Sequence, residues 1–218
     1  AMNLTLAIMP GPVNFHRGTR QSGIILDEQR HDASRGFAGG YVIETAADQP
    51  YGIATMIGGW GEQAADFMDQ YANIAGCWIT GEDPPDPNNR ITMHSSERDA
   101  YGLPVPVLEY SDHPNSVAMK RHATKQCESI YQSLGASRVE SRPDVGGGCH
   151  NMGVARMSEK PADGVTNRWG RLHEMPNLFV SDGSLFPSSA APNPTLTIVA
   201  LAIRQAGHIA EAMAKKEL

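Results

Sequence analysis

The sequence is short of long apolar runs, of cysteine and of charge, and each shortage disfavours a class of protein. No run approaches the roughly 20 apolar residues that span a bilayer, and the opening segment AMNLTLAIMP lacks the basic region of a signal peptide. The three cysteines, Cys77, Cys127 and Cys149, are odd in number and unpatterned, which disfavours a disulfide framework. We therefore expect reduced thiols and a cytoplasmic location, with a periplasmic one as the alternative.

Excess positive charge and metal-ligand patterns are also lacking. Charged residues make up 19% of the 218 positions, and 18 basic against 24 acidic residues give a net charge of −6. This balance disfavours a protein that binds the phosphate backbone of nucleic acid. The eight histidines and three cysteines form no C-x-x-C or H-x-x-x-H pair, so we expect no metal site.

Glycine and proline, in contrast, are abundant. The 22 glycines and 15 prolines predict many turns and limited helix. Short extended segments of mixed length alternate with these turn signals in the first half of the chain, which favours an antiparallel sheet over regular βαβ units. The predicted segments are 4–8, 40–44, 53–57, 77–81, 91–94 and 105–110.

Two helices are predicted from the spacing of apolar residues. After a turn at 111–114, this spacing predicts a helix that ends at Gly135. The last helix has Asn193 as a good N-cap and Pro194 as a good first residue. A polar loop and a strand at 178–181 lie between the two helices, which gives an α+β pattern. The apolar positions of the last helix are Leu196, Val199, Ile203, Ala206, Ala210 and Met213.

Residues 59–64, Gly-Trp-Gly-Glu-Gln-Ala, fit the dinucleotide-binding pattern G-x-G-x-x-G/A, and Glu82 follows about 20 residues later. The preceding segment is short and only partly apolar for a strand that is buried on both faces. We therefore favour a turn before an amphipathic helix, with a nucleotide site as the alternative.

Three polar features lie near predicted element ends in the last third of the chain. His150 follows a run of three glycines, where the backbone can approach a ligand closely. Asp182-Gly183-Ser184 follows the predicted strand, and Asn193 precedes the last helix. Each has a plain structural explanation: a structural histidine, a turn and a helix cap. Together they suggest a small-molecule site facing the start of the last helix, because a helix N-terminus favours anionic ligands.

The same segments resemble the glucose–methanol–choline (GMC) oxidoreductases. Residues 150–157, His-Asn-Met-Gly-Val-Ala-Arg-Met, resemble the family signature H-x-x-G-T-x-x-M. Residues 177–187 are similar to N-L-x-V-x-D-[AG]-S-x-x-P, and 193–202 to the closing helix of the family. Residues 59–61 and 89–92 resemble segments of the family's substrate domain. The sequence departs from the pattern at two positions, with Val154 in place of Thr and Ser158 in place of Gly.

The resemblance implies an FAD enzyme in which a hydride passes from a carbinol carbon to flavin N5. His150 would accept the hydroxyl proton, since imidazole is mostly neutral near pH 7. Asn193 would hydrogen-bond and orient the hydroxyl, because an amide is not a base. Asp182 and Gly183 would meet the FAD phosphate and ribityl region. Pro194 and Thr195 would begin a helix whose positive end points at the flavin pyrimidine edge.

The resemblance also implies a division of the chain and a missing part. Residues 1–145 would form a GMC-type substrate-binding domain, and 146–218 a catalytic loop and a C-terminal segment returning to the FAD-binding domain. Family members open with a glycine-rich Rossmann half, which we do not find here, so we expect a second polypeptide or a severed segment to carry it. The closing motif resembles the sugar-oxidising members, such as pyranose 2-oxidases and bacterial sugar dehydrogenases, and predicts a sugar or glycoside substrate. A non-catalytic binding module derived from such an enzyme is the alternative.

Overall fold

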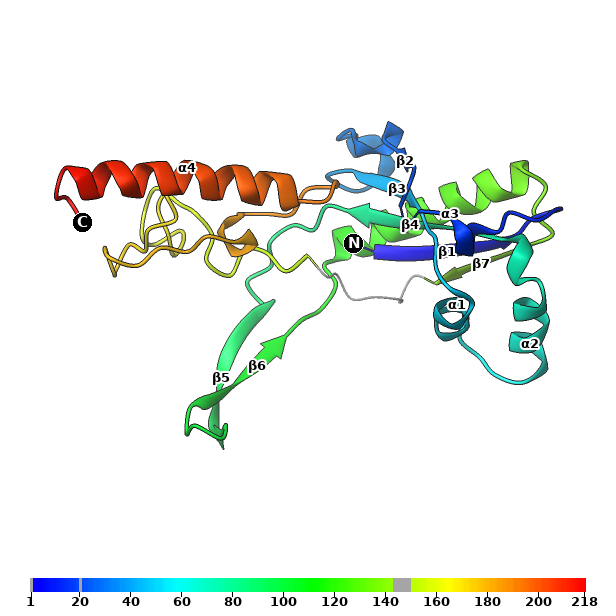
Figure 1. Cartoon of the computed structure of the whole chain (residues 1–218), viewed down its shortest axis with the longest axis horizontal. Coiled ribbons are helices and arrows are strands. Elements are labelled where there is room, and N and C mark those ends of the chain that lie inside the picture. The colour runs from blue at the N-terminus through cyan, green and yellow to red at the C-terminus, as the bar shows by residue number, and fades with distance from the viewer. Residues whose placement is uncertain (1, 20, 143–149) are drawn as a thin grey trace. The chain divides into compact units, whose positions relative to one another are not determined.

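The computed structural model describes residues 2–19, 21–142 and 150–218. Two compact units make up the chain: Ala1–Glu82 with Pro114–Cys149, and Asp83–His113 with His150–Leu218. We call them unit 1 and unit 2, and their elements are labelled in Figure 1. Residues 83–113 therefore belong to the same unit as the C-terminal segment. The functional division at residue 145 stays a prediction.

Unit 1 is built on a five-stranded antiparallel sheet in the order β2-β3-β4-β1-β7. Asn3 pairs with Ile79 where β1 and β4 meet, and β7 pairs with the other edge of β1. Because every neighbouring pair runs antiparallel, the predicted antiparallel sheet and α+β class are confirmed. The strands are β1 (Met2–Ile8), β2 (Ile24–Ile25), β3 (Tyr41–Thr45), β4 (Ile74–Gly81) and β7 (Arg138–Arg142).

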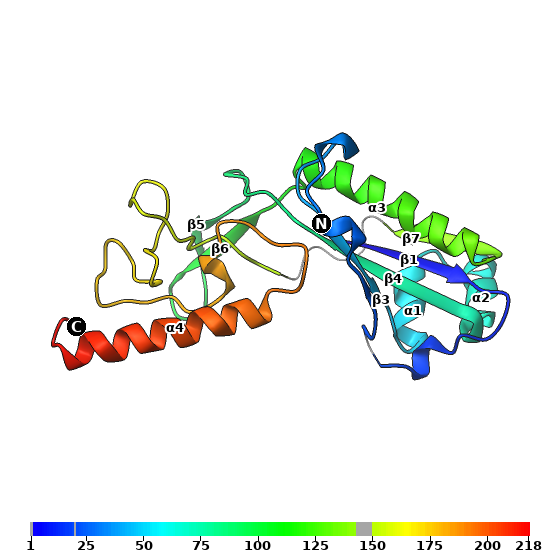
Figure 2. The ribbon, with the colours of Figure 1, turned by 90° about the horizontal axis from the view of Figure 1, so that it is seen from above.

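Helices cover both faces of this sheet (Figure 2). The long helix α3 (Pro114–Ser133) packs Met119, Ala123, Cys127 and Tyr131 against one face. Two short helices, α1 (Pro50–Ile57) and α2 (Glu62–Asp69), pack against the other face. Since successive side chains of a strand point to opposite faces, β1 contributes Ala7 to the first core and Leu4, Leu6 and Ile8 to the second.

Helix α3 confirms the helix predicted after the turn at 111–114. Its buried residues recur every three or four positions, which places them on one stripe of the helix. Gly135 follows the end of the helix with a φ of 81°, a left-handed conformation that glycine adopts without steric cost. The sequence pattern and the observed helix therefore agree in position.

The strand predicted at 53–57 is wrong, because these residues form the last part of α1. Pro50 occupies the first turn, and Ile53 and Ile57 are buried one helical turn apart. The glycine pair at 59 and 61 then leads directly into α2, and both glycines have positive φ. A dinucleotide-binding loop must follow a strand, so the structure excludes the nucleotide site at 59–64 and confirms a turn before a helix.

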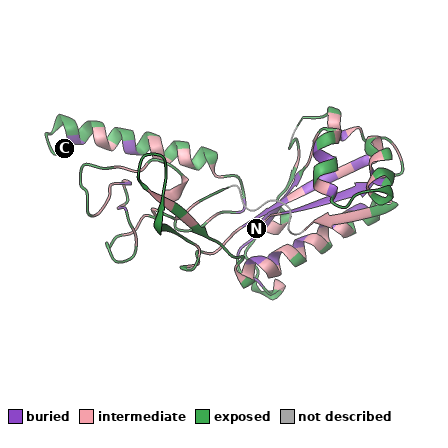
Figure 3. Cartoon of the chain, turned by 90° about the horizontal axis from the view of Figure 1, so that it is seen from below, coloured by how far each residue is buried: buried purple, intermediate pink, exposed green. Residues whose placement is uncertain are grey.

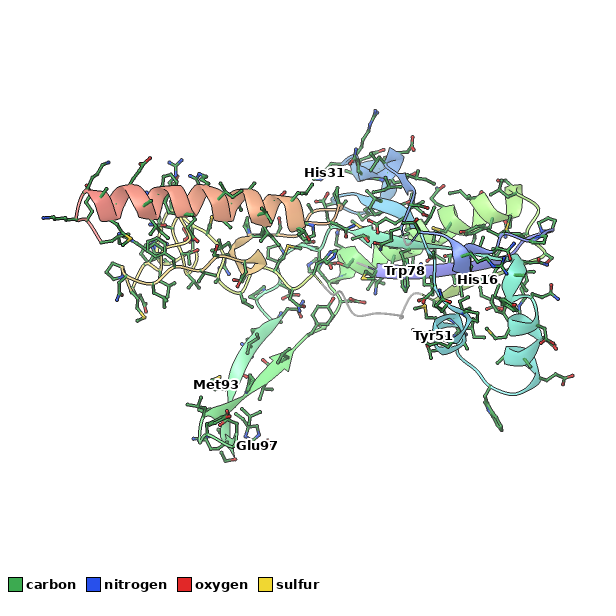
Figure 4. The ribbon with its side chains drawn as sticks, viewed as in Figure 1. His16, His31, Tyr51, Trp78, Met93 and Glu97 are labelled. Atoms are coloured by element: carbon green, nitrogen blue, oxygen red, sulfur yellow. The ribbon has the colours of Figure 1, made fainter. Side chains whose placement is uncertain are left out.

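Unit 2 contains a β-hairpin, a long loop and the C-terminal helix. The hairpin consists of β5 (Arg90–Arg98) and β6 (Pro104–Glu109), and Arg90 Nε contacts Glu109 Oε2 at 2.6 Å across it. Its side chains are mostly exposed. Met93 on β5 is 58% exposed, and Figure 4 labels it together with Glu97 near the hairpin end. Neither α4 nor any other helix among the described residues has both the length and the apolar character of a membrane span.

The C-terminal part of unit 2 differs from the prediction at two points. The strand predicted at 178–181 is wrong: only Phe179 pairs, in an isolated antiparallel bridge with Arg171. A strand extends only as far as a neighbouring strand supplies hydrogen bonds. The loop that contains Arg171 supplies two, between Leu172 N–H and the Leu178 carbonyl and between Val180 N–H and the Gly170 carbonyl. The last helix, α4 (Thr195–Ala214), begins one residue later than predicted, with Pro194 in the N-cap position.

The apolar face predicted for α4 points to solvent in this chain (Figure 3). Leu196 is 85% exposed and Ile203 69% exposed, whereas the polar Gln205 is 7% exposed. We call the exposed set Leu196, Val199, Ile203 and Met213 the apolar stripe of α4. Nothing among the described residues buries this stripe, although its apolar spacing is that of a packed helix face.

Candidate active site

The two signature segments that precede α4 lie side by side in unit 2. Ala155 N–H donates to the Ser184 carbonyl at 3.0 Å, and Met157 N–H donates to the Leu185 carbonyl at 2.9 Å. Gly153 has a φ of +88°, and a Cβ placed on it would lie 3.5 Å from the Phe186 carbonyl oxygen. Residues about 30 positions apart in the sequence are thus joined through their backbones.

Gly183 marks the point where these two segments meet the first turn of α4. A Cβ built on this glycine would contact Ile198 Cδ1 at 3.3 Å, and the Asn151 carbonyl oxygen and Met152 Cγ at 3.5 Å each. The contacts are tight, so a larger side chain would push the segments apart. The three segments that carry the sequence signature therefore converge on one small residue.

Asp182 caps the short 3₁₀ helix Gly183–Leu185. Its Oδ1 accepts the Ser184 N–H at 2.8 Å and the Ser184 hydroxyl at 2.5 Å. The hydroxyl hydrogen bond, followed by the N–H bond, lowers the pKa of the Asp182 carboxyl below its usual value. The side chain is exposed and keeps further acceptor capacity. A charged carboxylate accepts hydrogen bonds from ligand hydroxyls and repels phosphate, so this residue suits a ribityl chain better than a phosphate group.

Helix α4 presents its N-terminus next to this junction. The first intrahelical bond runs from Ile198 N–H to the Pro194 carbonyl at 3.0 Å. The amides of the first turn have no intrahelical acceptor, and they carry the positive end of the helix dipole. Thr195 is exposed and Pro194 is half-buried. Such a terminus is suited to the negatively charged edge of a cofactor or ligand.

The predicted capping role of Asn193 is wrong. Pro194 occupies the N-cap position, and the described residues give it no side-chain cap hydrogen bond. Asn193 lies one position earlier and is exposed. The position that caps α4 is therefore held by a proline, whose side chain has no hydrogen-bonding group.

His150 is exposed and is the first described residue after 143–149. Cys149 and the glycines at 146–148 lie outside the described residues. Val154, which stands where the family signature has threonine, is 60% exposed. The pairing of His150 with Asn193 at one reaction centre stays a prediction, as do the cofactor roles of Asp182, Gly183, Pro194 and Thr195.

Gln205 is a structural residue that the sequence analysis missed. Its Nε2 donates to the Trp169 carbonyl at 2.8 Å and to the Val180 carbonyl at 2.7 Å, which fastens two loop segments to α4. Trp169 also stacks on His208, with ring centroids 4.2 Å apart, and Arg204 lies over the indole at 3.9 Å. One feature of the sequence could have indicated that this face of α4 is buried. A second helical stripe is less apolar than the predicted one that begins at Leu196, and it consists of Ile198, Ala202, Gln205, Ile209 and Ala212.

Replacing Gly170 by alanine is expected to destabilise unit 2. Gly170 has a φ of +71°, and an added Cβ would lie 2.3 Å from Gln205 Nε2 and 2.5 Å from the Val180 carbonyl oxygen. We expect the free energy of unfolding to fall by about 2–4 kcal/mol, from backbone strain and the displaced hydrogen bonds. Chemical denaturation of the chain measures this change.

Gly207→Ala is the matched control. Gly207 lies within α4, and apart from its chain neighbours and the adjacent helix backbone no described atom is within 4 Å of an added Cβ. Alanine should raise the free energy of unfolding by up to about 1 kcal/mol through its higher helix propensity. Equal effects of the two substitutions would contradict the packing of Gly170 against Gln205.

Comparison with known proteins identifies the class of protein that this fold and site define. The family model for the C-terminal region of GMC oxidoreductases matches residues 85–202. The chain belongs to the GMC oxidoreductase family, which confirms the resemblance of its motifs. The match includes hairpin β5–β6, the signature segments around Gly183 and the first turns of α4.

Several characterised proteins are similar to the chain. It is 34% identical to 2-methyl-1,2-propanediol dehydrogenase from Mycolicibacterium austroafricanum, over 82% of this chain and 34% of that protein. It is 36% identical to paromamine 6'-oxidase from Streptomyces fradiae, over 59% of this chain and 24% of that protein. The fructose dehydrogenase large subunit from Gluconobacter japonicus is 32% identical, over 67% of this chain and 26% of that protein. The chain thus spans about a quarter to a third of the length of these relatives.

Among solved structures, pyridoxine 4-oxidase from Mesorbium loti has a similar fold. The TM-score is 0.59 at 17% sequence identity, and the match covers 95% of this chain and 42% of that protein. At this identity the likeness concerns the fold alone. It agrees with the α+β class predicted from the sequence.

Proposed function

We propose that this chain is the C-terminal, substrate-binding and catalytic portion of an FAD-dependent oxidoreductase that oxidises a CH–OH group. The observation that carries the proposal is the convergence of three signature segments at Gly183, beside a charged carboxylate and the N-terminus of α4. These groups suit a ligand that has both hydroxyl groups and a negatively charged edge. FAD has both, and when bound it supplies the acceptor for a hydride.

In this proposal the residues of the chain have separate roles in proton transfer, substrate orientation and cofactor binding. His150 would take the hydroxyl proton as a general base, a role for which an exposed imidazole is chemically suited. Asn193 would hold the hydroxyl by a hydrogen bond, because an amide donates and accepts but does not remove a proton. Asp182 would accept hydrogen bonds from the ribityl hydroxyls. Gly183 would let the backbone approach the cofactor closely.

The proposed substrate is a sugar, a glycoside or a related alcohol. The names of similar proteins describe the oxidation of paromamine, fructose, C-glycosides and pyranose. The name of another similar protein describes a small diol. The group common to these names is an alcohol, so we propose oxidation at a CH–OH carbon and favour a carbohydrate.

The activity is proposed to require an FAD-binding segment in addition to these 218 residues. The chain spans about a third of the length of 2-methyl-1,2-propanediol dehydrogenase. The apolar stripe of α4 is exposed, with Leu196 and Ile203 each more than two-thirds accessible. A second polypeptide or a severed segment that carries a Rossmann unit would bury this stripe and complete the cofactor site.

Flavin binding tests the proposal. The chain alone, titrated with FAD, should give no stable yellow complex, whereas the chain expressed with the FAD-binding segment should copurify with flavin and oxidise a sugar or alcohol. A chain that binds FAD and oxidises alcohols alone would contradict the need for a second segment. A complete assembly that holds no flavin would instead support a non-catalytic binding module.

Asn193→Asp and Asn193→Ala separate a role in binding from a structural one. Because Asn193 does not occupy the N-cap position of α4, we expect either substitution to change the free energy of unfolding by less than about 0.5 kcal/mol. In the complete enzyme both should lower kcat/KM by about tenfold or more, through loss of an oriented hydrogen bond. Steady-state kinetics and thermal unfolding of the same samples make the comparison. Full activity of the Asp variant would remove Asn193 from the site.

A further inference from the structure

Two of the three cysteines meet inside the core of unit 1. Cys77 lies in β4 and is 6% exposed, and Cys127 lies in α3 and is 1% exposed. Both belong to the core cluster that joins α3 to the sheet. The two thiols are hydrogen-bonded to each other, so their sulfur atoms are in direct contact.

The strand register and neighbouring side chains also bring the two cysteines together. Thr5 in β1 stands directly opposite Cys77 in the antiparallel register. The Thr5 hydroxyl also bonds to the Cys127 thiol, so the same threonine lies beside both cysteines. Tyr131, one helical turn after Cys127, hydrogen-bonds to Cys77. The two sulfurs are therefore enclosed between the sheet and α3.

We propose that Cys77 and Cys127 are an oxidisable dithiol that forms a disulfide between β4 and α3. The oxidant would be a peroxide. One sulfur attacks a peroxide oxygen, the O–O bond breaks, and a sulfenic acid and one water are formed. The second sulfur then attacks the first, the S–O bond breaks, and a second water leaves. In sum, two thiols and one hydrogen peroxide give one disulfide and two waters.

The hydrogen bonds indicate which sulfur attacks first. Cys127 and then Tyr131 donate to Cys77, and these bonds lower the pKa of the Cys77 thiol although burial raises it. The same bond and burial raise the pKa of the Cys127 thiol. A thiolate is the nucleophilic form of cysteine, and Cys77 is also the more accessible thiol, at 6% exposed against 1% for Cys127. Cys77 therefore becomes the sulfenic acid, and Cys127 resolves it.

The disulfide would connect residues 50 positions apart in the sequence. A cross-link of this span reduces the conformational freedom of the unfolded chain. Oxidation is therefore expected to raise the midpoint of thermal unfolding of unit 1 by roughly 10 °C relative to the reduced chain. The redox state of the pair would set the stability of unit 1, separately from any role in turnover.

The test uses the full chain carrying Cys149→Ser, which removes the third thiol. Native protein is treated with hydrogen peroxide, free thiols are counted after denaturation, and unreduced proteolytic peptides are analysed by mass spectrometry. We expect loss of two thiols, a peptide pair joining Cys77 to Cys127, and a higher unfolding midpoint that dithiothreitol reverses. Adding Cys77→Ala or Cys127→Ala should abolish the shift in midpoint.

Two results would overturn the proposal. One is that both thiols remain free in native protein while peroxide oxidises exposed methionines in the same sample. The other is that an internal disulfide forms but leaves the unfolding midpoint unchanged. If an alanine variant does not fold, comparison of the oxidised and reduced Cys149→Ser protein alone decides between the outcomes.

Discussion

Replacing His150 by alanine is expected to lower turnover of the complete enzyme by about 10²–10⁴-fold, the usual cost of losing a general base. FAD should remain bound, because the groups proposed to hold it are Asp182, Gly183 and the start of α4. His150 is exposed, so its removal should also leave the free energy of unfolding almost unchanged. Turnover, flavin absorbance and thermal unfolding, measured on one preparation, separate these effects.

His31→Ala is the control for this substitution. His31 contacts Glu82 at 2.9 Å, and its side chain is 71% exposed, so the pair contributes little to stability. The control should keep normal turnover. Near-normal turnover of the His150→Ala enzyme would remove His150 from the mechanism, and loss of flavin from that variant would indicate a structural role instead.

Ile203→Glu is expected to prevent assembly with the FAD-binding segment. Ile203 lies in the middle of the apolar stripe of α4 and is 69% exposed in this chain, so the chain itself should fold normally. Burying an unpaired carboxylate at an interface costs several kcal/mol. We expect affinity between the two segments to fall by at least about 100-fold, which corresponds to roughly 3 kcal/mol. Copurification and analytical ultracentrifugation measure it.

Gln132→Glu provides the matched control for charge. Gln132 is an exposed residue of α3 in unit 1, so the substitution adds one carboxylate to a helix without touching the stripe. This variant should assemble like the parent. If Ile203→Glu assembles equally well, the stripe is not the contact surface, and the FAD-binding segment must cover another part of the chain.

Local patterns in the sequence were sufficient to predict the type and position of several strands and helices. The strands β1, β3 and β4 were predicted as short extended segments between turn signals, and α3 from apolar residues at helical spacing. The predicted positions agree with the structure within a few residues. The segment at 53–57 failed because a short apolar run has no distinctive period, and Pro50 and Ile53 fit a helix as well as a strand. The strand at 178–181 failed because strand formation depends on a partner elsewhere in the chain.

The sequence by itself determined the family of this protein, because the spacing of His150, Asp182 and Asn193 within their motifs is a local property of the chain. Only the tertiary structure decided which stripe of α4 is buried, since Gln205 gains its hydrogen bonds from Trp169 and Val180, 25 or more positions away. The convergence on Gly183 is likewise a tertiary feature. It arises because the segment at 151–152 and the first turn of α4 both pack against this glycine, and the sequence of any one segment does not predict that contact. Apolar spacing predicts that a helix has a face to bury, but the elements available to pack against it determine which face that is.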